Sequence, residues 1–154
     1  MLEQLGKHAG FDLKIVATSD LEVDTHHTIE DVGIVVGGCL AEALGDKVGV
    51  RRFASNLVPL DEALVQVALD LSGRPFIAYD VDPISEWIGT FDPQLAEEFW
   101  RAFAFAAGIT LHVRSLEGRN GHHVIEASFK AVARALRDAV RIEGTGIPST
   151  KGSL

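Results

Sequence analysis

The sequence predicts a single α+β domain made of two half-repeats, with a sheet on one side and the helices packed together on the other. Runs with helical spacing alternate with short apolar runs that are typical of strands. The order helix, glycine, strand, turn, helix occurs twice along the chain, which indicates an internal duplication. The length of 154 residues suits one domain, and the hydrophobic content of 47% is enough for a sizeable core.

The first half-repeat is expected to begin with a helix over residues 1–10, because its last residue is a glycine, a common helix end. Residues 11–18 alternate apolar and polar side chains, and this period of two predicts a strand with one buried face. Residues 20–25 are acidic and predict a turn. A helix over residues 25–44 follows, with Thr25 as its N-cap.

The rest of the chain is assigned from the same signals. Runs of Val and Leu predict strands, apolar faces with a period of 3.6 predict helices, and glycine or proline clusters predict breaks. In order, the predicted elements are a short strand at 48–50, a turn at 59–63, a core strand at 64–71, a strand at 76–79, a loop at 80–93 anchored by Trp87, a helix at 94–107, a strand at 109–116, a turn at 118–121, a helix at 122–140 and a tail at 142–154.

The repeat can be aligned residue by residue. Gly10 corresponds to Gly108, and the pair that begins at His26 corresponds to the pair that begins at His122. Extended backwards, this alignment places Met1 opposite Phe99, so the first half is expected to lack its opening strands. We place the first half-repeat at about residues 1–80 and the second at about 81–154 of a single domain spanning 1–154.

Composition restricts the kinds of partner. The net charge of −8 argues against nucleic acid and anionic membranes as partners, although a few local cations could hold a small anion. The single cysteine, Cys39, has no internal disulfide partner and lies in an apolar run, so we expect a buried, inert thiol. No signal-like or membrane-spanning stretch is found, which favours a cytoplasmic protein.

Two copies of a His-His-x-x-Glu motif stand at the starts of the two longest predicted helices. The first lies in Asp24-Thr-His-His-Thr-Ile-Glu-Asp31 and the second in Gly121-His-His-Val-Ile-Glu-Ala127. Residues three and four apart share a helix face, so the glutamate of each motif projects beside both of its histidines. Imidazole with carboxylate suits manganese, iron or zinc. The spacing therefore predicts that the two motifs face each other across metal ions.

The histidine pairs indicate more than one ion. Adjacent histidines point about 100° apart on a helix, so one of each pair can serve one ion and its neighbour a second. Four of the chain's six histidines are in these pairs, which favours metal binding over surface or capping roles. The remaining two, His8 and His112, are interpreted as structural.

Three further segments, together with the two histidine motifs, resemble one known family. They are Pro59-Leu-Asp-Glu-Ala63, Leu69-Asp-Leu-Ser-Gly-Arg-Pro75 and Pro148-Ser-Thr-Lys-Gly152. With them, the chain closely resembles imidazoleglycerol-phosphate dehydratase over essentially its whole length. The resemblance implies a fold similar to domain 2 of ribosomal protein S5. It also implies a hydro-lyase of histidine biosynthesis, which converts imidazole glycerol phosphate to imidazole acetol phosphate. A segment before Met1, carrying one further metal-binding histidine, is expected from it as well.

The resemblance also implies a site with two manganese ions at subunit boundaries. One ion would bind His27, His122 and Glu126, and the other His26, Glu30, Glu98 and His123. Glu30 and Glu126 would be candidates for moving protons. The phosphate of the substrate would be bound by Arg52, Arg74, Lys130, Ser149, Thr150 and Lys151. The protein would assemble into a large homo-oligomer, a 24-subunit shell built from trimers.

Alternatives remain at this stage. Clusters of histidine and carboxylate also serve two-metal hydrolases of phosphate or amide bonds. A non-catalytic assembly module stabilised by metal would use the same ligands. Without the resemblance, Arg52 and Arg74 are interpreted as members of ordinary surface ion pairs.

Overall fold

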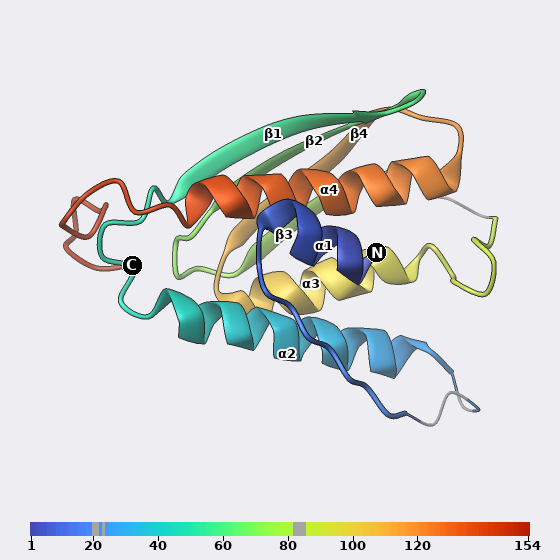
Figure 1. Cartoon of the computed structure of the whole chain (residues 1–154), viewed down its shortest axis with the longest axis horizontal. Coiled ribbons are helices and arrows are strands. Elements are labelled where there is room, and N and C mark those ends of the chain that lie inside the picture. Colours follow the sequence, from blue (N-terminus) through green and yellow to red (C-terminus); the bar gives the residue numbers. More distant parts are fainter. Residues whose placement is uncertain (20–21, 23, 82–85) are drawn as a thin grey trace.

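The computed structural model describes residues 1–19, 22, 24–81 and 86–154 (Figure 1). The predicted turn at 20–25 and the predicted loop at 80–93 lie partly outside these ranges. The helices are α1 (Leu2–Ala9), α2 (His26–Leu44), α3 (Leu95–Ala107) and α4 (Gly121–Ala139). The strands are β1 (Phe53–Leu60), β2 (Ala63–Asp70), β3 (Phe76–Asp80) and β4 (Thr110–Glu117). Among the described residues, no helix is both long and apolar enough to cross a membrane.

The strands form one sheet in the order β1-β2-β4-β3, in which β3 runs parallel to β4 and the other neighbours are antiparallel. Helices α3 and α4 contact the sheet, α2 packs on α3, and α1 packs on α4 (Figure 1). The core between α3, α4 and the sheet is aromatic and aliphatic, with Trp100, Phe103 and Leu111 at most 1% exposed. The predicted α+β class, with a sheet packed on helices, is confirmed.

The helices pack in pairs that correspond to each other under the predicted repeat. The repeat pairs α1 with α3 and α2 with α4, so it exchanges the packed pair α2–α3 with the packed pair α4–α1. Gly10 and Gly108 end the two shorter helices with left-handed φ angles of 71° and 63°. These glycines confirm both predicted helix ends.

Residues 11–18 differ from the prediction, because they run extended but form no strand in the structure. Their counterpart β4 is a strand because β2 and β3 pair with it on either side. No described strand of the first half lies beside residues 11–18, so their backbone has no ladder to join. The predicted strand at 48–50 is likewise reduced to a single bridge between Val50 and Ile142.

Strand β1 was missed by the sequence analysis. It carries Asn56 and Pro59, which are unusual in strands, and its more exposed face includes Phe53 and Leu57, so polar and apolar residues do not alternate clearly. As the first strand of the sheet, β1 is an edge strand, where a proline is tolerated because one side of the backbone needs no donor. Trp87 also differs from its predicted anchoring role, since it is 63% exposed.

Glycines set the distance between α2 and α3. A Cβ on Gly33 would lie 2.8 Å from the carbonyl oxygen of Phe99, and one on Gly37 would lie 2.5 Å from that of Phe103. Gly37 lies four residues after Gly33, and Phe103 lies four residues after Phe99, so the two helices run in the same direction. This close packing brings the starts of both helices to the same end of the molecule (Figure 1).

We expect Gly37→Ala to destabilise the protein by about 1–3 kcal/mol, because the new methyl group has no room against α3. The adjacent Gly38→Ala is the matched control. Nothing lies within 4 Å of a Cβ there, so alanine should stabilise the helix by about 0.5–1 kcal/mol. Urea unfolding of both variants measures this difference, and equal midpoints would contradict the close packing.

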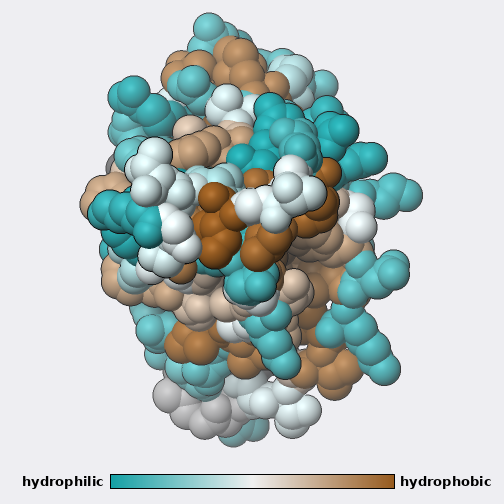
Figure 2. Space-filling view, turned by 90° about the vertical axis from the view of Figure 1, so that its left-hand side faces the viewer, coloured by the Kyte–Doolittle hydropathy of each residue, from teal (hydrophilic) through white to brown (hydrophobic). Residues whose placement is uncertain are grey.

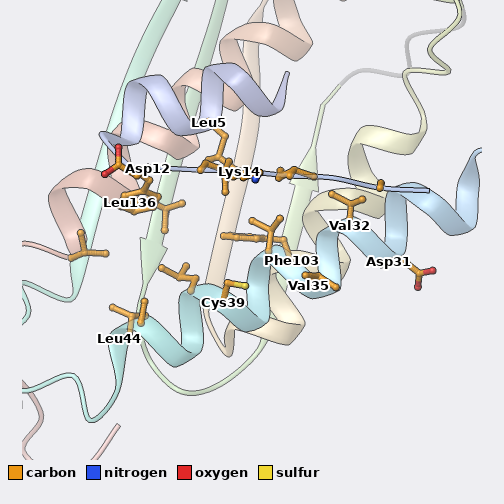
Figure 3. A pocket seen from close by; sticks show the side chains of 18 of the residues that line it. Leu5, Asp12, Lys14, Asp31, Val32, Val35, Cys39, Leu44, Phe103 and Leu136 are labelled. Carbon is orange, nitrogen blue, oxygen red and sulfur yellow. The ribbon is translucent and has the colours of Figure 1, made fainter. Parts of the chain in front are cut away.

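An apolar pocket of about 870 Å³ lies between residues 11–19, α2 and the neighbouring faces of α1, α3 and α4 (Figure 3). Leu5, Val32, Phe103 and Leu136 line it from four different helices. Cys39 also lines it and is exposed, which corrects the expectation of a buried thiol. The physical reason is that α2 is covered by α3 on one side, whereas its face toward residues 11–19 is left partly open.

Candidate metal centre

The two histidine motifs lie at the same end of the molecule, because α2 and α4 both begin there (Figure 1). Within the described residues, no group of three or more His, Cys, Asp or Glu side chains is arranged to hold a metal ion. Each motif therefore offers part of a site, and the predicted meeting of the two across metal ions stays a prediction.

The motif on α4 forms the pair that helical spacing predicts. Nε2 of His122 lies 3.0 Å from Oε2 of Glu126, one turn further along the helix. The other carboxylate oxygen of Glu126 lies 2.7 Å from Nζ of Lys130. These contacts, with the Lys130 ammonium first, hold the pKa of Glu126 below its usual range. Glu126 is thus an ionised group that can bind a cation.

The donor set of this pair fits a divalent metal ion. Two neighbouring ligands at right angles around an ion, with bonds of about 2.1 Å, are about 3.0 Å apart. The His122 and Glu126 atoms have this separation, and the imidazole side chain is half exposed, so an ion could reach it. A nitrogen and a carboxylate oxygen are ligands that manganese, iron and zinc accept.

The second histidine of α4 is held by a carboxylate from another part of the chain. Nδ1 of His123 lies 2.8 Å from Oε2 of Glu62, and its Nε2 lies 3.8 Å from Oδ2 of Asp61. The contact with His123 and the N–H groups of Asn120 and Arg119 lower the pKa of Glu62 to about 2. Glu62 in turn raises the pKa of His123.

The motif on α2 is more exposed than the motif on α4. Nδ1 of His27 lies 3.1 Å from Oδ1 of Asp24, and its Nε2 lies 3.3 Å from Oγ of Ser19. Asp24 also accepts a hydrogen bond from the N–H of His26 at 2.8 Å, so its side chain takes the capping place predicted for Thr25. The side chains of His26 and Glu30 are exposed.

Glu98 lies in the first turn of α3, where its Oε2 is 3.9 Å from Nε of Arg101. The parallel packing of α2 on α3 places Gly33 against Phe99. Glu30 precedes Gly33 by three residues and Glu98 precedes Phe99 by one, so both lie near the starts of the two helices. Their grouping around one ion stays a prediction.

Except for Lys130, the predicted phosphate-binding residues lie at the opposite end of the molecule, near the C-terminal end of α4. The N–H of Arg52 donates to the carbonyl of Ala139 at 2.9 Å, and its Nε and Nη2 bind the carboxylate of Asp70 at 2.7 and 3.1 Å. Nη1 of Arg52 also donates to the carbonyl of Pro148 at 2.8 Å. Arg52 is therefore a partly buried ion-pair residue that fixes the tail.

Arg74 and the tail complete this end. Nη2 of Arg74 is 3.8 Å from Asp70, and the side chain is 66% exposed, which leaves it accessible to an anion. Ser149 Oγ accepts from the N–H of Lys151 at 3.2 Å, and both Thr150 and Lys151 are exposed. Figure 2 faces this end and shows hydrophilic residues interleaved with apolar patches. Lys130 is not in this group, because it contacts Glu126.

The predicted metal-binding and phosphate-binding sets are separated by the length of α4. Its 19 residues span about 28 Å at about 1.5 Å per residue. His122 and His123 stand at its start, whereas Arg52 is hydrogen-bonded at its end. The sequence analysis placed both sets in one site at subunit boundaries and did not predict how far apart one chain holds them.

Glu62, which contacts the predicted ligand His123, was given no role by the sequence analysis. It lies in the Pro59-Leu-Asp-Glu-Ala63 segment, which was interpreted as a turn and as part of the family resemblance. Its contact with His123 joins residues 61 positions apart, through the pairing of β2 with β4. Neither a local spacing nor a repeated motif signals such a contact.

Known proteins of one family resemble this chain over most or all of its length. The family model described as imidazoleglycerol-phosphate dehydratase matches residues 1–136. A protein of that name from Acidothermus cellulolyticus is 57% identical over 155 residues, which cover 100% of this chain and 75% of the relative. Another from Alkaliphilus metalliredigens is 54% identical, covering 100% of this chain and 80% of the relative.

Solved structures agree as well. Imidazoleglycerol-phosphate dehydratase from Staphylococcus aureus matches with a TM-score of 0.86 and 41% identity, covering 92% of this chain and 80% of that one. The enzyme from Pyrococcus furiosus, in complex with (S)-C348, matches with a TM-score of 0.88 and 38% identity, covering 99% and 83%. The chain therefore belongs to the imidazoleglycerol-phosphate dehydratase family of hydro-lyases.

Proposed function

We propose that the protein dehydrates imidazole glycerol phosphate to imidazole acetol phosphate, with two divalent metal ions, most suitably manganese, as cofactors. The use of metal ions is supported by the pair of His122 and Glu126, whose facing nitrogen and oxygen atoms are 3.0 Å apart, the separation of two neighbouring metal ligands. Family membership supports the reaction. The histidines of both motifs, with Glu30, Glu98 and Glu126, are the proposed ligands.

The ions, when bound, would act as Lewis acids that stabilise the negative charge developing as the substrate loses a proton and a hydroxyl group. The carboxylate side chains of the proposed site have different roles. Lys130 holds the pKa of Glu126 low, so this carboxylate suits cation binding better than proton donation, and its lowered pKa makes it a weak base if it accepts the proton. Glu30 is exposed at the start of α2 and is the other proposed proton carrier.

The phosphate of the substrate would be bound at the opposite end of the chain. Arg74 is exposed there, and each terminal nitrogen of Arg52 keeps a second N–H beyond those that bind Asp70 and Pro148. Guanidinium donors suit a phosphate dianion. Ser149, Thr150 and Lys151 supply hydroxyl, backbone and ammonium groups beside them.

A small phosphorylated imidazole is far shorter than α4, so it cannot contact both sets in one chain. We propose that the protein self-associates, as a 24-subunit shell built from trimers, and that one copy's metal-binding end meets another's phosphate-binding end. Exposed apolar side chains support an association. They include Ile34, Val35, Phe53, Leu57, Phe76, Phe105 and Ile142, each at least 47% exposed.

The test of the reaction is a product assay with imidazole glycerol phosphate and manganese. We expect formation of the ketone, imidazole acetol phosphate, without release of inorganic phosphate. Phosphate release would instead support a two-metal hydrolase, which uses similar ligands. Absence of both products in a metal-loaded, assembled sample would favour a non-catalytic assembly module.

A further inference from the structure

Glu62 connects two parts of the molecule through the two oxygens of one carboxylate. It lies in the turn between β1 and β2, and Oε1 accepts hydrogen bonds from the N–H groups of Arg119 at 3.1 Å and Asn120 at 2.8 Å. Oε2 lies 2.8 Å from Nδ1 of His123. One oxygen thus holds the turn before α4, while the other holds the imidazole ring.

The fold fixes this contact from several sides. Antiparallel pairing sets Leu64 of β2 opposite Glu117 of β4, which brings the β1–β2 turn beside the turn that leads into α4. Gly118 allows close packing there, since a Cβ would collide with Cγ2 of Val124. Oδ1 of Asn120 accepts from the N–H groups of His122 and His123, so the backbone that carries the ring is also held.

The contact determines where a neutral imidazole keeps its proton. Oε1 of Glu62 already accepts two backbone N–H groups, and Oε2 faces the ring as a carboxylate oxygen, which only accepts hydrogen bonds. The nitrogen that faces it, Nδ1 of His123, must therefore be the N–H donor. The neutral ring has one N–H, so Nε2 is left with its lone pair free to bind a cation.

We propose that Glu62 is a positioning residue that keeps the proton of His123 on Nδ1 and thereby presents Nε2 as the metal-binding atom. Carboxylates commonly orient metal-binding histidines in this way, and they also make the imidazole a better donor. Asp61 stands 3.8 Å from Nε2, so a second negative charge lies on the side where the ion would bind. The assignment of the proton to Nδ1 rests on the observed contacts alone. Metal binding by Nε2 rests on the proposed function.

Glu62→Gln tests this proposal because glutamine has nearly the same shape as glutamate but can place an N–H donor where the carboxylate oxygen Oε2 accepts. The amide oxygen of glutamine can replace Oε1 and accept from the two backbone N–H groups. The amide N–H then points at Nδ1 of His123, which must become an acceptor, so the proton moves to Nε2. The opposite amide orientation is disfavoured because it would set an NH₂ group against two backbone donors.

The first measurement needs no metal. Long-range proton–nitrogen correlation spectra of the metal-free protein, recorded above the pKa of His123, report which ring nitrogen is protonated, and a His123→Gln sample assigns the signals. We expect the Nδ1–H form in the parent and the Nε2–H form in Glu62→Gln. Asp61→Asn removes a neighbouring carboxylate without touching Nδ1 and should keep the parent form. An Nε2–H form in the parent, or the same form in Glu62→Gln, would overturn the assignment.

The second measurement is a manganese titration of the same proteins, followed by calorimetry. We expect Glu62→Gln to weaken binding at the His123 site by about 10–100-fold, and more than Asp61→Asn does. Equal melting temperatures of the metal-free proteins would show that a difference in affinity is not caused by a difference in folding stability. Unchanged affinity with a swapped tautomer would overturn the role of Nε2. If the parent binds no manganese, the proposed metal function fails, while the spectra still decide whether Glu62 sets the tautomer.

Discussion

Manganese is expected to raise the melting temperature of the metal-free protein by roughly 5–10 °C when present at about 100 times its dissociation constant. A ligand that binds only the folded state contributes about 2.7 kcal/mol at that concentration, and a protein of this size gains about 2–4 °C per kcal/mol. His26 and His123 belong to different helices and, in the proposed site, to the same ion. The double variant His26→Ala/His123→Ala should lose most of this response in differential scanning calorimetry.

The matched control replaces the two histidines outside the motifs. His8 contacts Gln4 on α1, and His112 packs against the ring of Phe76 on the sheet. His8→Gln/His112→Gln should keep the full response to manganese. A response that survives in the motif variant and is lost in this control would place the ion elsewhere. The response should also weaken on dilution, because one chain does not assemble the ligands among its described residues.

The helices could be predicted from the sequence because their signals are local. Glycine after α1 and α3 and an apolar face on α3 are properties of consecutive residues, and both helix ends are where they were expected. Strands depend on partners that the local sequence does not specify. Residues 11–18 have the alternation of a strand but no described strand to pair with, whereas β1 has a weak pattern and forms a strand by pairing with β2.

The same distinction holds at the site. The contact between His122 and Glu126 follows from a spacing of four residues on one helix, so the motif predicts it. The contact between Glu62 and His123 depends on the register of β2 against β4, which no short motif encodes. The separation of Arg52 from the histidines likewise depends on the direction and length of α4, and the sequence analysis placed them in one site without it.

Two variants that are each inactive are expected to restore activity when they assemble together. His122→Ala removes a proposed metal ligand at the start of α4, and Arg74→Ala removes an exposed guanidinium at the other end of the molecule. Each should lower kcat/KM for the dehydration by about 100-fold or more, because each removes a charge-stabilising group from the site. Both side chains are at least half exposed, so the fold should be little affected.

Activity of the mixed assembly distinguishes a site shared between two copies of the chain from a site within one chain. If a site takes its metal-binding end from one copy and its phosphate-binding end from another, random mixing in equal amounts leaves about a quarter of the sites with neither change. Co-expression of the two variants should then recover about a quarter of the parent activity. If each site came from one chain, every site would carry one of the changes and no activity would return. Two different affinity tags, one on each variant, show whether the purified assemblies contain both. If such mixed assemblies are no more active than either variant alone, the shared site is contradicted. The length of α4 then no longer supports self-association.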